Sequence, residues 1–163
     1  MTEQAVCLDN ELLLESATEI FDTMVYLELE EAEEPDLTTD NFDLLGSITF
    51  KGSLDGCMSV RCSSDCAKTI AANMLGIDSV DEVSEEDMSD AIGEIVNMVM
   101  GSIKARLQDH IGGFEVSIPT VASGHQIKGR LVDGADKISV LVNIEDEFLA
   151  ELSLSYRRSN TEA

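Results

Sequence analysis

The chain has 163 residues, of which 44% are hydrophobic, and its 33 acidic residues against 10 basic ones give a net charge of −23. These values are typical of a globular protein that buries a sizeable core. They argue against nucleic acid or an anionic membrane surface as a partner, because both require basic patches. No basic segment precedes an apolar run at the amino terminus and no stretch reaches transmembrane length, so we expect a cytoplasmic protein.

Residues 1–46 contain fourteen acidic residues and no lysine or arginine. Asp9 can cap a helix that runs to about Tyr26. The predicted buried stripe of this helix consists of Leu13, Ala17, Ile20, Phe21, Met24 and Val25. An edge strand is expected to begin within Tyr26–Leu29, and residues 30–43 have the composition of an acidic loop. Solubility explains the charge of this region; attraction of a basic partner surface is an alternative without a supporting motif.

A second helix is predicted in the middle of the chain. Ser63 or Ser64 can cap its start, and Gly76 can end it. Its predicted buried residues are Ala67, Ile70, Ala71, Met74 and Leu75.

Five segments have the pattern of β-strands. They are Ser47–Lys51, Cys57–Cys62, Phe114–Val121, Lys137–Asn143 and Phe148–Tyr156. Predicted turns lie at Asp55-Gly56, Asp133-Gly134 and Glu145-Asp146.

The longest predicted helix follows Ser84, which forms a capping-box pattern with Asp87. At about 100° per residue, its buried face consists of Met88, Ile92, Ile95, Val96, Val99, Ile103 and Leu107. Its opposite face carries Asp90, Glu94, Asn97, Gly101 and Gln108. Gly93 and Gly101 lie on or beside that outer face, although a glycine inside a helix costs about 1 kcal/mol relative to alanine. Such a cost is retained where another molecule approaches the backbone closely.

Strands joined by short turns and interrupted by helices predict an α/β fold of the α+β type. We expect a largely antiparallel sheet, on which the long central helix and two further helices pack. The length is that of a single domain covering residues 1–163. Within it we distinguish an acidic helix and loop at 1–46, a core at 47–156 and a polar tail at 157–163.

The four cysteines, Cys7, Cys57, Cys62 and Cys66, include no C-x2-C pair, and the chain has only two histidines. This spacing matches no zinc site. It favours small apolar core residues over a metal or redox role, so we expect no metal bound by this chain.

Glu94 and Asn97 lie three residues apart and so project side by side from the central helix. Neither Ser89 nor Ser102 has a neighbouring histidine in the sequence that would activate it as a nucleophile. No phosphate-binding glycine loop follows a strand. From these residues alone, the pair is best interpreted as a binding epitope.

A longer pattern contains this pair: Asp90-x3-Glu94-x2-Asn97, followed after twenty-one residues by Pro119. The surrounding segments read DAIGEIVNMVMG and FEVSIPTVASG. From about Gly46 to Tyr156, the chain resembles the CheC/CheX/FliY family of chemotaxis phosphatases. One full copy of the motif is present, as in the CheX branch. The nearest second candidate, Glu15-x3-Glu19-x2-Asp22, lacks the asparagine and is interpreted as ordinary helix surface.

The resemblance implies a phosphatase that dephosphorylates the phospho-aspartate of a CheY-type response regulator. In such a mechanism Asn97 orients the attacking water and Glu94 pairs with a lysine of the regulator. Met98 and Gly101 lie in the contact, and Asp90 assists electrostatically or serves only as an acid favoured early in a helix. Mg2+ is expected on the regulator rather than on this chain.

Two other functions stay open from the sequence. Domains of this kind resemble the middle part of flagellar switch proteins, which bind regulators and scaffold assemblies without catalysis. An acidic dimerisation module is the third possibility. Single-motif relatives are dimers whose sheets join across the interface, which implies a homodimer here.

Overall fold

In the computed structural model of the chain, the described residues are 8–32, 42–111, 113–124 and 136–158. Three α-helices are present: α1 (Asn10–Ile20), α2 (Ser64–Leu75) and α3 (Glu85–Ile111). A π-turn, η1 (Phe21–Val25), continues α1, and a 3-10 turn, η2 (Val80–Glu82), precedes α3. The strands are β1 (Leu29–Glu31), β2 (Leu44–Gly52), β3 (Leu54–Cys62), β4 (Phe114–Val116), β5 (Thr120–Ser123), β6 (Asp136–Ile144) and β7 (Phe148–Arg158).

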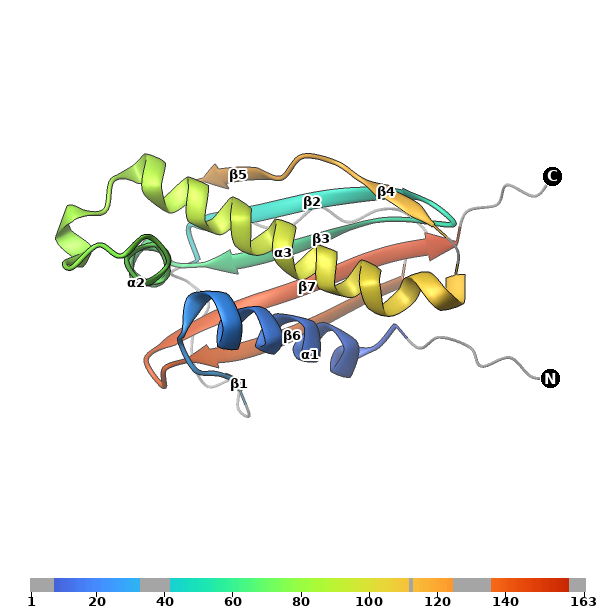
Figure 1. The fold of residues 1–163 in the computed structure, drawn as a ribbon, viewed down its shortest axis with the longest axis horizontal. Coiled ribbons are helices and arrows are strands. Elements are labelled where there is room, and N and C mark those ends of the chain that lie inside the picture. Colours follow the sequence, from blue (N-terminus) through green and yellow to red (C-terminus); the bar gives the residue numbers. More distant parts are fainter. Residues whose placement is uncertain (1–7, 33–41, 112, 125–135, 159–163) are drawn as a thin grey trace.

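The seven strands form one sheet in the order β1-β6-β7-β3-β2-β4, and β5 also pairs with β2. Every pairing is antiparallel. All three α-helices lie on one face of the sheet, with α3 running across its middle (Figure 1). The predicted antiparallel sheet with helices on it is therefore confirmed. No helix among the described residues is long and apolar enough to cross a membrane.

Helix α3 lies close to the sheet because strand β2 presents a glycine beneath it. A Cβ on Gly46 would lie 2.7 Å from Cγ2 of Ile92 and 2.9 Å from Cγ2 of Val96. Both of these side chains are fully buried. Only a residue without a side chain lets the helix pack at this distance, so Gly46 sets the depth of α3 in the core.

Helix α1 begins as predicted, with the Asp9 carboxylate accepting a 3.0 Å hydrogen bond from the Leu12 N–H. Its predicted buried stripe is wrong at one position, because Met24 is 47% exposed while Val25 is buried. The cause is the π-turn, in which the Tyr26 N–H bonds to the Phe21 carbonyl five residues earlier. One extra residue in the last turn rotates Met24 outward.

Helix α2 also has the predicted ends, since Ser63 caps it and Gly76 ends it at φ 70°. Leu75 was expected to be buried but is 50% exposed. It lies in the last turn, at the margin of the buried stripe, where the helix stops.

The predicted turn at Asp55-Gly56 is wrong, because both residues lie within β3 and the reversal falls at Gly52 and Ser53. Gly52 has φ 146°, and its N–H donates to the Asp55 carboxylate. Gly56 is needed for another reason: a Cβ there would lie 2.1 Å from the Ser155 carbonyl oxygen on the paired strand. The glycine thus permits close strand packing.

Three further boundaries differ from the predictions. The segment Phe114–Val121 is divided into β4 and β5, with Ser117–Pro119 between them. The edge strand β1 starts at Leu29, and β7 extends past Tyr156 to the start of the predicted tail. The Glu145-Asp146 turn is confirmed, with both residues at φ 57°. The Asp133-Gly134 turn and most of the acidic loop lie outside the described residues.

Candidate functional site

The candidate site is built on α3, whose start is fixed by two reciprocal hydrogen bonds. The Ser84 N–H donates to Asp87 Oδ2 at 3.1 Å, and the Asp87 N–H donates to Ser84 Oγ at 3.0 Å. This is the predicted capping box, which satisfies two backbone groups that would otherwise lack partners. Because the first turn is fixed, the phase of the outward face is fixed as well.

The predicted division of α3 into two faces is confirmed. The buried face consists of Met88, Ile92, Ile95, Val96, Val99, Ile103 and Leu107. On the opposite side, Asp90, Glu94, Asn97 and Gly101 are exposed, and Met98 is half-buried against the core. Gln108 completes the predicted outer face, and its side chain lies outside the described set. Gly93, by contrast, is buried.

Glu94 and Asn97 are presented together in the middle of this exposed face. Residues three apart on a helix have Cβ atoms about 5–6 Å apart, so the carboxylate and the carboxamide are neighbours. Within the described parts of the chain, neither side chain makes a hydrogen bond or an ion pair. Both polar groups are therefore available to a partner.

The two glycines of α3 differ in their surroundings. A Cβ on Gly101 would meet nothing within 4 Å, so the packing of this chain does not require glycine there. A Cβ on Gly93 would lie 3.6 Å from Cγ2 of Val121 and 4.0 Å from Cγ of Pro119, which is ordinary contact. Gly101 lies one turn after Asn97 and leaves the helix backbone bare beside it.

The connection between β4 and β5 brings Pro119 close to α3, where its ring lies near Gly93. The preceding Ser117 is tied to the sheet: its N–H donates to the Thr49 carbonyl at 2.9 Å, and its Oγ accepts from the Thr49 N–H at 3.0 Å. Between Ser117 and Pro119, Ile118 is 83% exposed. No sequence signal distinguished Ile118, because an isoleucine in an apparent strand is typical of a core residue.

The other flank of α3 is tied to α1 through Glu19. Its Oε1 accepts hydrogen bonds from Arg106 Nη1 and from Ser102 Oγ, each at 2.8 Å. Bonding by Arg106, and then by Ser102, lowers the pKa of Glu19. Glu19 was the central residue of the incomplete second motif, and its carboxylate is engaged within the chain.

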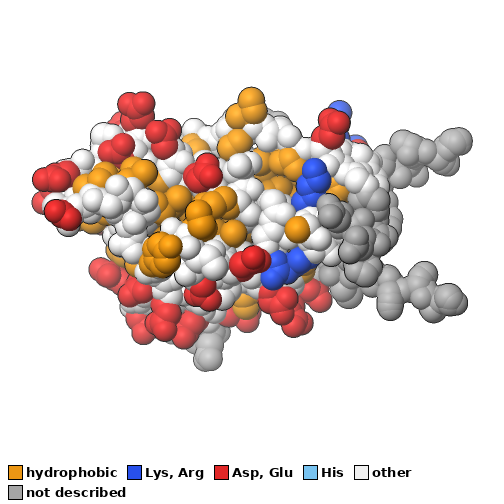
Figure 2. Space-filling model, in the orientation of Figure 1, with side chains coloured by type: hydrophobic (Ala, Val, Ile, Leu, Met, Phe, Trp, Pro, Cys, Tyr) orange, Lys and Arg blue, Asp and Glu red, His pale blue; other side chains and the backbone are white. Residues whose placement is uncertain are grey.

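Hydrophobic side chains gather over α2 and in the seam between α1 and α3, while carboxylates crowd the margins (Figure 2). The large exposed hydrophobic residues in the described ranges are Met24, Tyr26, Leu75, Val80 and Ile118. The helical side of the molecule therefore combines apolar contact area with the exposed polar pair.

The described cysteines behave as core or partly buried residues. Cys62 and Cys66 are fully buried, and Cys57 is half-buried. Hydrogen bonding with Cys66, followed by burial, raises the pKa of the Cys62 thiol, which makes it a poor nucleophile. No group of three His, Cys, Asp or Glu residues in the described ranges could hold a metal ion.

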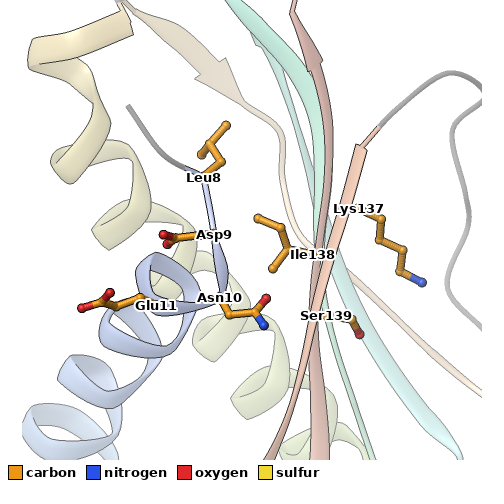
Figure 3. A pocket seen from close by; sticks show the side chains of 7 residues that line it. All are labelled: Leu8, Asp9, Asn10, Glu11, Lys137, Ile138 and Ser139. Atoms are coloured by element: carbon orange, nitrogen blue, oxygen red, sulfur yellow. The ribbon is translucent and has the colours of Figure 1, made fainter. Parts of the chain in front are cut away.

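An open recess lies at the amino-terminal end of α1, against the start of β6. It is lined by Leu8, Asp9, Asn10, Glu11, Lys137, Ile138 and Ser139. Figure 3 shows the Lys137 side chain on the side of β6 away from α1. The Asp9 carboxylate is already occupied in capping α1. None of the site residues on α3 lines this recess.

Comparison with known proteins gives a consistent result. The family model for chemotaxis phosphatase CheX matches residues 44–143. The CheY-P phosphatase CheX of Thermotoga maritima is 30% identical over 112 residues, which cover 68% of this chain and 71% of that protein.

Two solved structures show the same fold. The chemotaxis protein CheX of Vibrio vulnificus aligns with a TM-score of 0.79 and 26% identity, over 95% of this chain and all of that one. CheX in the CheX–CheY–BeF3–Mg2+ complex of Borrelia burgdorferi aligns with a TM-score of 0.70 and 17% identity, over 91% and 97% of the two chains. With the exposed Glu94 and Asn97 on α3, these matches establish that the chain belongs to the CheX family of chemotaxis phosphatases.

Proposed function

We propose that this chain hydrolyses the phospho-aspartate of a CheY-type response regulator, using Asn97 to orient water and Glu94 to dock the regulator. The observation that carries the proposal is the pair itself: a carboxylate and a carboxamide, both exposed and unengaged, in the middle of α3. The Thermotoga relative is named a CheY-P phosphatase, which supports the same reaction here.

Hydrolysis of the phospho-aspartate requires little from this chain beyond positioning the attacking water. Phosphoryl transfer depends on an in-line arrangement of nucleophile and leaving oxygen and on stabilisation of charge. The Asn97 carbonyl accepts a hydrogen bond from water, while its NH2 group donates to a phosphoryl oxygen. Water attacks phosphorus, the bond to the aspartate oxygen breaks, and the products are the free carboxylate and inorganic phosphate. Mg2+ on the regulator neutralises phosphoryl charge, and we assign no metal to this chain.

Glu94 supplies binding and orientation. A carboxylate that meets a lysine of the regulator forms a charge-assisted contact, which also fixes the angle of approach. Asp90, one turn earlier, adds negative potential without a bond of its own in the described structure. Gly101 and Met98 form the floor of the contact, because a bare backbone and a flexible thioether admit a close neighbour.

We also propose that the protein is a cytoplasmic homodimer. The edge strand β1 pairs only with β6 among the described strands, and an edge of this kind can pair with a second copy. A light-scattering mass of two chains at micromolar concentration would support this assembly, and a mass of one chain would contradict it.

The reaction is tested by following phosphate loss from purified CheY-type regulators, each phosphorylated with acetyl phosphate in Mg2+. The unmutated chain should accelerate the loss for at least one regulator. Asn97→Ala should slow the catalysed rate by roughly 10²–10³, the scale for losing one preorganised polar group, and should still bind the beryllofluoride-loaded regulator. Binding without turnover by the unmutated chain would instead indicate a non-catalytic regulator-binding module.

A further inference from the structure

Ile118 is the most exposed of the large hydrophobic side chains in the described structure, at 83%. Single exposed apolar residues are common on protein surfaces, and exposure alone carries no inference. Ile118 differs because its two neighbours place it between the sheet and α3. Ser117 is bonded to Thr49 through two backbone-directed contacts, and Pro119 lies against α3 beside Gly93.

Residues near Ile118 in the sequence lie close to α3. Gly93 is one turn before Asn97 on α3, so the Pro119 ring lies beside the turn that leads to the catalytic carboxamide. On the same side, farther along α3, Lys104 Nζ lies 5.8 Å from the ring centre of Phe114 in β4. The β4–β5 segment therefore has Pro119 near Gly93 and Phe114 near Lys104, and Ile118 is exposed to solvent between these two positions.

We propose that Ile118 is an apolar docking residue for the phosphorylated regulator, contacting it beside Asn97. The inference rests on the proposed phosphatase function and extends the contact from α3 to the β4–β5 connection. A regulator whose phosphoryl group reaches Asn97 lies over α3, and its surface then continues onto the neighbouring connection. Burying an aliphatic side chain at such a contact stabilises the complex.

The opposite flank of α3 carries another candidate docking residue for the regulator. Leu75 at the end of α2 is also aliphatic and is 50% exposed, and α2 lies on the other side of α3 from β5 (Figure 1). Val80 in η2 is 42% exposed and precedes α3, fourteen residues before Glu94 in the sequence. These two residues provide matched controls, one on the competing flank and one outside α3 and the β4–β5 connection.

The experiment compares Ile118→Ser, Leu75→Ser and Val80→Ser with the unmutated chain. The substrate is the acetyl-phosphate-treated CheY-type regulator that the unmutated chain dephosphorylates fastest. Ile118→Ser should raise KM about tenfold, the scale for losing most of one aliphatic burial, with kcat within about twofold. Its affinity for the beryllofluoride-loaded regulator should fall by the same factor. Val80→Ser should change neither quantity.

Three outcomes would overturn the inference. An unchanged KM in Ile118→Ser, with turnover by the unmutated chain intact, removes Ile118 from the contact and leaves the phosphatase function standing. A raised KM in Leu75→Ser alone places the regulator on the α2 flank. Absence of turnover and binding by the unmutated chain with every regulator removes the proposed function, and this inference with it. Because Ile118 is exposed, its replacement leaves the core untouched.

Discussion

Ser102 Oγ donates a 2.8 Å hydrogen bond to Glu19 Oε1, and this bond joins α3 to α1 five residues beyond Asn97. Arg106, one turn later, donates to the same carboxylate oxygen. The helix that carries the site thus has neighbours on three sides: it is bonded to α1 through Glu19, packs closely on Gly46 of the sheet, and lies near Pro119 of the β4–β5 connection. A pair of side chains on such a helix can keep a fixed geometry.

We expect Glu19→Gln to make the stability of the fold less dependent on pH in the acidic range. Bonding to Arg106 and Ser102 lowers the pKa of Glu19 below its ordinary value of 4.5. The stabilisation is therefore present above that value and is lost as the pH falls through the lowered pKa of the folded chain. The effect is small because the group is exposed. Denaturant midpoints measured from pH 6 downward would show it, with Glu15→Gln on the same helix as a control; identical curves for both variants would contradict the expectation.

Gly46→Ala should destabilise the fold. The added Cβ would come within 3 Å of the fully buried side chains of Ile92 and Val96, and overpacking of this kind costs about 1–3 kcal/mol. To relieve the contact, α3 must move away from β2, so turnover should fall as well. Chemical unfolding and phosphate release measure the two effects. A variant as stable as the unmutated chain would show that α3 is not held at this depth.

The sequence predicted the parts of the fold that depend on local chemistry. Ser84 and Asp87 form their capping box wherever the helix packs, and the seven apolar residues of α3 share one face by periodicity alone. The exposure of Glu94 and Asn97 follows from the same phase. These features need no knowledge of the rest of the chain.

The errors arose where distant segments decide the local structure. Gly56 resembles a turn glycine in the sequence, but its role is to let the Ser155 carbonyl approach from β7. The exposure of Met24 follows from a π-turn that no hydrophobic pattern encodes. Ile118 looks like a strand residue in the sequence, but it lies in the break between β4 and β5, where Ser117 bonds to β2 and Pro119 lies near α3. Such roles appear only once the tertiary neighbours are known.

Gly101→Ala should separate stability from function. The new Cβ would meet nothing within 4 Å, and replacing an interior helix glycine by alanine stabilises the helix by up to about 1 kcal/mol. If the regulator approaches the backbone at this position, the same methyl group should raise KM. Unfolding and turnover are measured on one preparation. Gly46→Ala serves as the comparison, because the same substitution is expected to destabilise the fold there. A stabilised variant with unchanged KM would mean that no partner atom comes close to Gly101.

Glu94→Gln tests whether the carboxylate acts through its charge. Gln keeps nearly the same shape and helix propensity, so the fold should be unaffected, and Glu94 has no partner in the described chain to lose. If Glu94 pairs with a lysine that is desolvated in the complex, removing its charge should weaken binding of the beryllofluoride-loaded regulator roughly thirtyfold or more. The affinity of the unmutated chain should also fall with added salt more steeply than that of the variant.

The matched control for this change is Glu86→Gln. Glu86 is exposed on the same helix, eight residues earlier, which places it about 12 Å from Glu94 along the axis. Glu86→Gln removes the same charge from the same helix. If Glu94 acts only through general electrostatic attraction, both variants should therefore bind the regulator more weakly, and by a similar factor. A specific ion pair predicts a large effect at Glu94 and little at Glu86. Equal effects would reassign Glu94 from docking residue to one member of a diffuse acidic surface, and would leave Asn97 as the one residue of the pair in direct contact with the reaction.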